Sequence, residues 1–253
     1  MIRLVSFNIR TPAKSDGPSY LPHRVDNIIA TIKEKQPDLI GFQELIADES
    51  YQRIKEGLPE YDDFGYGRYT DFTNETNKIF YKKDAFLLLY ADQMWLSDTP
   101  RVPGSRFEIQ SNCPRVLVAL KLFHKETGKR FFVINTHLDH ISNEARVYGL
   151  RQLFHLAAEL KAEEDLPIFI TGDFNFDCHE PLYEQFALNG YTDLTADLGY
   201  TFHGFMKAEN FSKIDYILCD TPLDFKASKW HEGAIPGVFI SDHDPVCVDF
   251  DFK

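Results

Sequence analysis

Short apolar segments rich in β-branched and aromatic residues recur along the whole chain, and they constrain its fold more than any other feature. They read IRLVSFNI, DLIGFQE, IFYKK, AFLLLY, RVLVALKLF, RFFVINTH, PIFITGDF, IDYILC and PVCVDFDF. This composition favours β-strands, whereas the spacing of apolar residues predicts helices over 23–36, 143–162 and about 181–189. Because the strands are too numerous for one simple open sheet, we expect an α/β fold with two packed sheets and helices outside them.

The composition favours one folded domain and excludes some classes of function. Hydrophobic residues make up 43% and aromatic residues 14% of the 253 residues, which is enough for a sizeable core. No linker or close repeat divides the chain, so we expect a single domain over residues 1–253. The net charge of −12 argues against a protein that coats nucleic acid, since such binding depends on excess lysine and arginine. Local binding of a few phosphates stays open.

The cysteines and the N-terminal sequence indicate the cellular compartment in which we expect the protein. The four cysteines are widely spaced and form no CxxC motif, which indicates ordinary reduced thiols. The N-terminal MIRLVSFNIR lacks the pattern of a signal peptide. The longest apolar run, AFLLLYA, is far shorter than the ~20 residues of a membrane span. We therefore expect a cytoplasmic protein with no membrane contact and no obligate protein partner.

Polar residues interrupt, begin or end six of the predicted strands. They are Asn8; Gln43 and Glu44; Asn135, His137, Asp139 and His140; Asp173 and Asn175; Asp215; and Asp242, His243 and Asp244. Each alone has an ordinary interpretation as a turn, a cap or a hydrogen-bonded core group. Burying all of them unpaired would cost ~1–3 kcal/mol apiece. The sequence therefore predicts that they converge on one shared site at the end of a sheet.

The types of side chain indicate the chemistry of that site. Hard oxygen ligands suit Mg²⁺ or Mn²⁺, and they are supplied by Glu44, Asp173, Asp242, Asn8 and Asn175. Two histidines beside carboxylates suit proton transfer. Zinc is disfavoured at THLDH, because its two histidines lack a further matching pair. In TGDFN we expect the glycine, Gly172, to form a permissive turn and Phe174 to pack away from the site.

The ordered set of motifs resembles the endonuclease/exonuclease/phosphatase superfamily, which includes DNase I, AP endonucleases, inositol polyphosphate 5-phosphatases and nocturnin-type deadenylases. The residues that carry the resemblance run from Ser6 to Asp249 and are Asn8, Gln43-Glu44, Asn135-Thr136-His137, Gly172-Asp173-Phe174-Asn175, Asp215 and Ser241-Asp242-His243. The segments FYKK, MWLSDTP, NTHLDH and TFHGF are similar to bacterial single-domain members near the nocturnin-like branch. The resemblance implies a four-layer α/β/β/α sandwich and cleavage of a phosphoester that depends on Mg²⁺ or Mn²⁺.

The resemblance also implies roles for individual residues. Glu44 would be the principal metal ligand, with Asn8 and Asp242 near the ion. Asp173 would orient or deprotonate the attacking water, and Asn175 would hold a phosphate oxygen. The groups that contact the scissile phosphate would be His137 and His243, oriented by Glu75 and Asp215 respectively. Arg115 matches a phosphate-binding arginine, although an ordinary arginine at the start of a surface strand stays an alternative.

The substrate is left open between two classes. A phosphodiesterase or nuclease, including a 3′–5′ exonuclease on single-stranded nucleic acid, is the leading hypothesis. It would use stacking aromatics and a basic track, for which the candidates are Tyr66, Tyr69, Phe72, Phe107, Phe174 and Phe205, and Arg10, Lys14, Arg68, Arg101, Arg106 and Arg115. The alternative is a phosphatase acting on an inositol phosphate, a sugar phosphate or a nucleotide.

Segments 11–21 and 107–114 depart from the family pattern and are candidates to line the cleft. Asp244 departs as well, since relatives more often carry an aromatic or small residue there. The complete set of site residues argues against an inactive interaction module.

Overall fold

Two six-stranded sheets form the centre of the molecule in a computed structural model that describes residues 1–252. The first sheet has the order β13 (Leu223–Lys229), β14 (Val246–Phe252), β1 (Ile2–Asn8), β2 (Leu39–Gln43), β6 (Ile79–Lys82) and β4 (Tyr61–Phe64). The second has the order β11 (Thr192–Asp193), β12 (Asp215–Cys219), β10 (Ile168–Asp173), β9 (Arg130–His137), β8 (Val116–His124) and β7 (Phe86–Trp95). A two-stranded ribbon joins β3 (Leu45–Ile46) to β5 (Glu75–Thr76).

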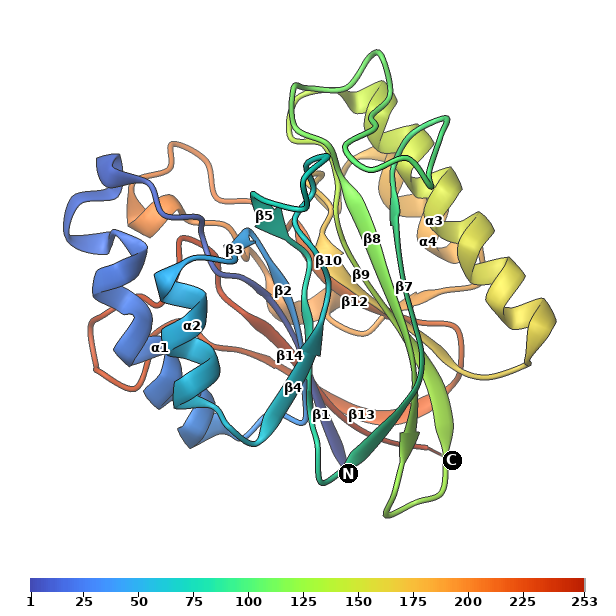
Figure 1. The fold of residues 1–253 in the computed structure, drawn as a ribbon, viewed down its shortest axis with the longest axis horizontal. Helices are drawn as coiled ribbons and strands as arrows, with labels where there is room; N and C mark the ends of the chain where they lie inside the picture. Colours follow the sequence, from blue (N-terminus) through green and yellow to red (C-terminus); the bar gives the residue numbers. More distant parts are fainter. Residues whose placement is uncertain (253) are drawn as a thin grey trace.

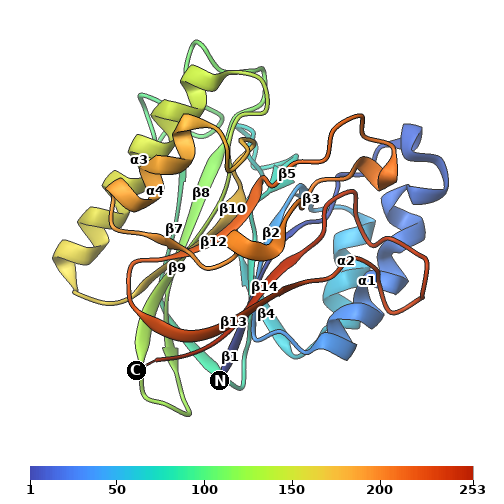
Figure 2. The same cartoon turned by 180° about the vertical axis from the view of Figure 1, so that it is seen from behind.

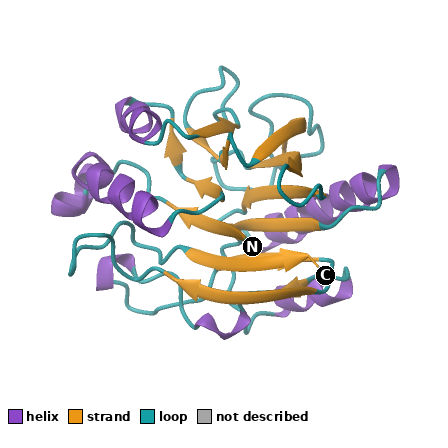
Figure 3. Cartoon of the chain, turned by 90° about the horizontal axis from the view of Figure 1, so that it is seen from below, coloured by secondary structure: helices purple, strands orange, loops and turns teal. Residues whose placement is uncertain are grey.

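Helices cover the outer face of each sheet. Figure 1 shows α1 (Leu21–Lys35) and α2 (Glu49–Gly57) beside the first sheet, and α3 (Asn143–Glu163) and α4 (Glu184–Leu188) beside the second. The view from behind (Figure 2) and the view from below (Figure 3) show the same order of layers. Short 3₁₀ turns occur at Lys14–Ser19, Pro181–Tyr183, Ala196–Leu198 and Gly204–Met206. This arrangement confirms the expected four-layer α/β/β/α sandwich.

Three apolar cores separate the four layers. One core packs α1 and α2 on the first sheet through residues such as Ile28 and Phe42. The middle core joins the inner faces of the two sheets, for example through Phe169 and Phe250, whose ring centroids are 4.4 Å apart. The third packs α3 and α4 on the second sheet, and Phe174 is fully buried in it. Each sheet face is thus buried against another layer, as a strand with apolar residues on both faces requires.

The helices begin and end close to the residues that the pattern predicted. Ser142 caps α3 by accepting a hydrogen bond from the backbone N–H of Ala145. The third predicted helix is split into a 3₁₀ turn over Pro181–Tyr183 and the short α4. The segment 98–115 contains no helix or strand, as expected. Within residues 1–252, no helix is both long enough and apolar enough to cross a membrane.

Each large sheet contains one parallel pair of strands, and these pairs determine where polar side chains meet. β1 runs parallel to β2, with Asn8 opposite Gln43, and β9 runs parallel to β10, with His137 opposite Asp173. β12 is antiparallel to β10 and places Asp215 opposite Asp173. The carboxyl ends of the four parallel strands lie at the same end of the sandwich, away from the two chain termini (Figure 1).

Candidate active site

A cleft of about 570 Å³ opens at this end of the sandwich, and it gathers most of the side chains that the sequence singled out. Eight of the ten predicted site residues line it, namely Glu44, Glu75, Arg115, His137, Asp173, Asn175, Asp242 and His243. The other two are hydrogen-bonded directly behind them: Asn8 contacts Glu44 and Asp173, and Asp215 contacts His243. Residues from eight separate strands and loops therefore converge on one cavity.

One side of the cleft is acidic. Glu44 follows β2 with a left-handed backbone (φ 62°), which is unusual for a residue other than glycine. Its side chain accepts hydrogen bonds from the backbone N–H of Thr11 (2.8 Å) and from Asn8 Nδ2 (3.1 Å). Burial raises the pKa of Glu44, but these two hydrogen bonds together with the positive charges of His243 and Arg10 outweigh it, and the net shift is downward. For Asp242, burial dominates and the pKa is raised.

The acidic side offers the donor set that a hard divalent cation binds. Carboxylates from two different elements, Glu44 and Asp242, face the same cavity, and like charge from Glu44 contributes to the raised pKa of Asp242. A cation between two such carboxylates would relieve that repulsion. The Asn8 amide is hydrogen-bonded at both ends: Nδ2 donates to Glu44 and Asp173, and Oδ1 accepts from the N–H of Arg10. Asn8 thus bridges the carboxylates of Glu44 and Asp173.

His243, which directly follows Asp242, forms a buried pair with Asp215. Nδ1 of His243 lies 2.8 Å from Oδ2 of Asp215, and both side chains are almost inaccessible. Burial of the ring lowers the pKa of His243, but the negative charge and hydrogen bond of Asp215, with Asp173 and Asp242, more than offset it and raise the pKa well above its usual value. His243 is therefore a cationic donor whose free Nε2 faces Asp173 at 3.8 Å.

Asp173 lies at the centre of the cleft. Its Oδ2 accepts a hydrogen bond from Asn8 Nδ2 (2.9 Å) and lies 3.5 Å from Nε2 of His137. Burial, and then the negative charge of Asp215, raise the pKa of Asp173 to about 7. His137 is shifted in the opposite direction: burial and the nearby Arg115 hold its pKa well below the usual value. The cleft thus contains one cationic and one neutral imidazole on either side of a carboxyl group that titrates near neutrality.

Arginines supply the positive wall of the cleft. Arg115 is buried, with one Nη 2.9 Å from Nδ1 of His140, and its Nε has no hydrogen-bond partner among residues 1–252. Arg68 forms a two-point ion pair with Glu75, at 2.7 and 3.0 Å. Glu75 therefore engages Arg68 here, and no hydrogen bond joins it to His137 in the part of the chain that the structure describes. Arg115 Nε instead lies 4.0 Å from Oδ2 of the buried Asp139.

The GDFN segment differs in detail from the expected turn. Gly172 lies inside β10 without a left-handed backbone, and a Cβ there would lie 2.6 Å from the carbonyl oxygen of Thr136. The glycine is therefore required for close approach of β9 and β10, not for a turn. The left-handed residue is Asn175 (φ 53°), whose backbone N–H donates to Asp173 Oδ1. Asn175 Nδ2 donates one of its two hydrogens to the carbonyl of Leu138. Its second hydrogen is left for a group in the cleft.

Some polar strand residues lie beneath the cleft and do not line it. Gln43 Nε2 donates to Asn135 Oδ1 (2.7 Å), and Thr171 Oγ1 donates to the same oxygen (3.0 Å). Asn135 Nδ2 donates to the carbonyl of Phe42. These groups are fully buried between the two sheets. The prediction that all strand-end polar groups meet at one site was therefore too simple: part of the set forms a supporting network.

The expected track of base-stacking and basic residues is only partly assembled. Arg10, Arg68 and Arg115 line the cleft, whereas Arg101 and Phe107 line a separate groove beside α3, and Phe174 is in the core. Residues with no assigned role also line the cleft: Thr11, Cys113, His140, Asp177, Glu180, Phe202 and Ser212. Thr11 and Cys113 belong to the two unusual segments. His140 was flagged only as polar, and nothing in the sequence pattern indicated Phe202.

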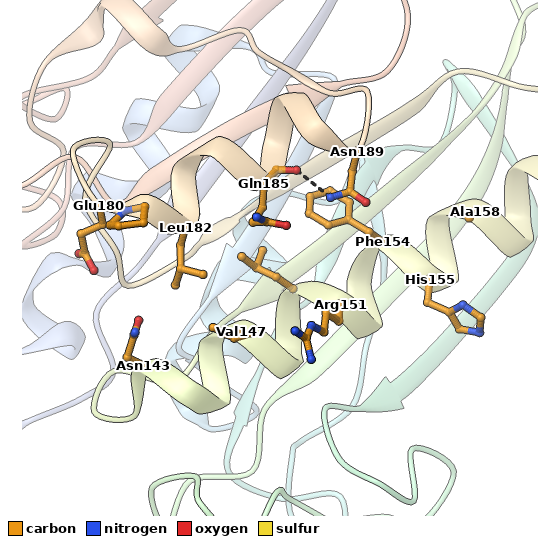
Figure 4. A pocket seen from close by; sticks show the side chains of 12 residues that line it. Asn143, Val147, Arg151, Phe154, His155, Ala158, Glu180, Leu182, Gln185 and Asn189 are labelled. Carbon is orange, nitrogen blue, oxygen red and sulfur yellow. Dashed lines mark hydrogen bonds between the residues drawn. The ribbon is translucent and has the colours of Figure 1, made fainter.

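A second groove, between α3 and the 181–189 segment, contains a different kind of lining. Figure 4 shows its wall of Val147, Phe154 and Leu182, with Arg151 and Gln185 along it. Glu180 borders both this groove and the catalytic cleft. Because the groove has no cluster of carboxylates and histidines, we assign the chemistry to the cleft at the strand ends.

A four-layer α/β/β/α sandwich with this polar cleft at its strand ends defines a DNase I-like protein. The model of the Endonuclease/Exonuclease/phosphatase family matches residues 5–243. The chain therefore belongs to this family, whose members are phosphoester hydrolases.

The chain is also similar to solved structures and to one curated sequence. The chain is similar to an endonuclease/exonuclease/phosphatase from Bacteroides vulgatus (31% identity, 100% of this chain and 99% of that chain, TM-score 0.91). It is also similar to a mannosyl-6-phosphatase of Bacteroides thetaiotaomicron (29% identity, 100% of both chains, TM-score 0.88). An uncharacterized protein of Acanthamoeba polyphaga mimivirus is 27% identical over 90% of this chain and 91% of its own length.

Proposed function

We propose that the chain is a divalent-metal-dependent phosphatase that acts on a small phosphorylated molecule such as a sugar phosphate. The observation that carries the chemistry is the convergence, in one cleft, of His243 held by Asp215, of Asp173 with its raised pKa, and of the buried guanidinium of Arg115. Transfer of a phosphoryl group to water needs these three functions: a donor, a base and charge compensation.

Glu44 and Asp242 are the residues proposed to hold Mg²⁺ or Mn²⁺, with Asn8 positioning the Glu44 carboxylate. Their oxygens are the ligand type that such ions prefer. When bound, the ion supplies charge neutralisation to the phosphate oxygens.

The remaining side chains divide the other tasks. The guanidinium of Arg115 and the second amide hydrogen of Asn175 are donors for phosphate oxygens. Nε2 of the cationic His243 donates to the phosphoryl group, and Asp215 keeps that ring protonated and oriented through Nδ1. The ionised form of Asp173 accepts a proton from the attacking water. The neutral His137, 3.5 Å from Asp173, donates a hydrogen bond that holds the carboxylate or the phosphate in place.

The lining beyond the phosphate position favours a compact polar substrate. Asp177 and Glu180 border the cleft on the side of Asn175, so a second phosphate on that side would meet negative charge. Hydroxyl groups of a sugar would instead find acceptors there. The full-length similarity to a structure described as a mannosyl-6-phosphatase supports the same substrate class.

A nuclease is the second candidate, and it is favoured by a different observation. Tyr66 and Phe72 are 52% and 49% exposed, and their ring centroids lie 5.8 Å apart on the loop that carries Arg68. Phe72 has a left-handed backbone (φ 61°), which is strained for a bulky side chain. Exposed rings next to a cleft arginine could stack bases of a single strand.

One experiment separates these candidates. Purified protein with Mg²⁺ or Mn²⁺ is assayed against hexose phosphates, inositol phosphates, nucleotides and single-stranded oligonucleotides. Glu44→Ala and His243→Ala are the test variants, and His155→Ala, an exposed surface change, is the control. We expect EDTA to abolish turnover and each test variant to lose at least ~100-fold. Turnover of oligonucleotides alone would replace the phosphatase by the nuclease, and wild-type rates in both variants would refute the mechanism.

The proposal of a single domain is tested by unfolding. The middle core draws residues from β1 to β14, including Ile2 and Phe250, so neither sheet can keep its inner face buried alone. We expect one cooperative transition in urea. Two separated transitions would contradict one domain.

A further inference from the structure

A second cluster of metal-ligating side chains lies outside the proposed hydrolytic machinery. It consists of His203, His231 and Asp244. One donor atom from each of the three residues lies within 4.8 Å of the others. They come from three segments: His203 from TFHGF, His231 from the loop after β13, and Asp244 from the position where relatives more often carry an aromatic or small residue.

Both imidazoles converge on the same oxygen of Asp244. Oδ1 lies 2.9 Å from Nδ1 of His231 and 3.3 Å from Nε2 of His203. The second oxygen, Oδ2, is 2.9 Å from Nζ of Lys229. A carboxylate that is fully buried thus has one oxygen neutralised by a lysine and the other faced by two imidazole nitrogens.

The His203 side chain differs from the other two in having a buried nitrogen without a hydrogen bond to any described residue. It is fully buried, and its Nε2 has no hydrogen-bond partner of acceptable geometry among residues 1–252. This nitrogen lies 3.3 Å from Oδ1 of Asp244 without a well-formed hydrogen bond, and such a buried group calls for an explanation such as an ion. Nδ1 of the same ring receives only a long contact, 3.4 Å, from the N–H of Met206.

We propose that His203, His231 and Asp244 form a zinc site distinct from the catalytic centre. Bonds of ~2.0–2.1 Å in a tetrahedral site place ligand atoms ~3.3 Å apart, close to the 2.9 and 3.3 Å measured between Asp244 Oδ1 and the two nitrogens. Two imidazoles and one carboxylate are a donor set for Zn²⁺, unlike the oxygen-rich acidic side of the cleft. His231 is 41% exposed, so solvent water can complete the coordination.

The surroundings are consistent with an ion at this position. The ring of Phe239 packs against both imidazoles, with centroids 4.9 Å from His203 and 5.2 Å from His231. An apolar neighbour of this kind lowers the local dielectric on one side of the site, while the exposed edge of His231 stays open to solvent. Coordination through Nε2 leaves the ring hydrogen of His203 on Nδ1, so the long contact from Met206 is given up. Lys229 stays on Oδ2 and fixes the carboxylate.

The site would tie together segments that shape the catalytic cleft. Asp244 directly follows His243, and its backbone N–H donates to the carbonyl of Thr201 (2.7 Å). The N–H of His203 donates to the carbonyl of Asp242 (3.0 Å). An ion on these side chains would therefore cross-link the loops that carry Asp242 and His243. This inference is independent of the identity of the substrate.

Binding of Zn²⁺, with Co²⁺ as a spectroscopic probe, tests the site without any assay of activity. Metal-free protein is dialysed against Zn²⁺ and its bound metal is measured, and Co²⁺ is titrated while its visible absorption is recorded. His231→Ala removes one ligand at an exposed position. His155→Ala is the matched control, and Glu44→Ala removes a proposed catalytic ligand. We expect a strong four-coordinate Co²⁺ band in the wild type, His155→Ala and Glu44→Ala.

The affinity of His231→Ala decides the proposal. We expect it to bind Zn²⁺ at least ~10-fold more weakly and to lose the Co²⁺ band, since even outer-shell changes cost metal sites this much. Zn²⁺ should also raise the Tm of Glu44→Ala, which lacks the catalytic ligand, but not that of the double variant Glu44→Ala/His231→Ala. An unchanged Co²⁺ band in His231→Ala, or a band that disappears only in Glu44→Ala, would overturn the site. Absence of the band in the wild type would do the same.

Discussion

Replacing Asp215 by asparagine tests the electrostatic logic of the cleft most directly. The substitution is nearly isosteric. In the unsubstituted protein Nδ1 of His243 lies 2.8 Å from Oδ2 of Asp215, and the amide of the variant can still contact that nitrogen. The substitution removes the negative charge that outweighs burial and raises the pKa of His243. In Asp215→Asn the pKa of His243 must therefore fall, because burial then acts with one fewer opposing carboxylate.

The size of the effect follows from the kind of contact that is lost. A hydrogen bond that involves a charged group contributes ~1.5–3 kcal/mol, and each 1.36 kcal/mol is a factor of ten in rate. If His243 donates a proton or a hydrogen bond in the transition state, kcat/KM should fall ~10- to 100-fold at neutral pH. The variant should stay folded, since no unpaired charge is created on the histidine once it is neutral.

The direction in which the pH profile shifts tests the protonation state of His243, which a simple loss of activity would not. A raised pKa keeps His243 protonated, so wild-type activity persists until pH passes that pKa. In Asp215→Asn the basic limb of kcat/KM should move to lower pH, and part of the lost activity should return as pH is decreased. The assay is steady-state kinetics across pH at saturating Mg²⁺, with the exposed Asp84→Asn as a matched control. An unchanged basic limb together with a large loss of rate would refute the assignment of His243 as the cationic donor.

Three further outcomes are expected. Gly172→Ala should lower the free energy of unfolding by ~1–3 kcal/mol, because its Cβ would lie 2.6 Å from the Thr136 carbonyl oxygen; an unchanged urea midpoint would contradict that close approach. Gln43→Ala removes a donor from Asn135 Oδ1 in the buried network and should cost ~1–3 kcal/mol in the same measurement, with little change in KM. Asp173 must be ionised to act as a base, so the acidic limb of kcat/KM should lie near its raised pKa of about 7, and tighter binding of Mg²⁺ should move that limb to lower pH.

The fold was largely predictable because its central strands carry their signal locally. Segments such as Arg130–His137 and Ile168–Asp173 are apolar on both faces, which marks strands covered on each side. Two edge strands of the first sheet were missed for the same reason. Leu223–Lys229 is mostly exposed and Tyr61–Phe64 carries two adjacent aspartates, so only their pairing with β14 and β6 makes them strands.

The sequence by itself determined which side chains stand at strand ends, and hence the kind of chemistry that the chain can support. Only the tertiary structure decided how those side chains pair. Glu75 engages Arg68, Arg115 contacts His140, and the buried Gln43 and Asn135 support the cleft from beneath. The physical reason is that pairing depends on sheet register and layer packing: Asn8 and Asp173 are 165 residues apart in the chain, yet share a hydrogen bond of 2.9 Å. A pattern of neighbouring residues in the sequence does not specify how far apart two sheets lie.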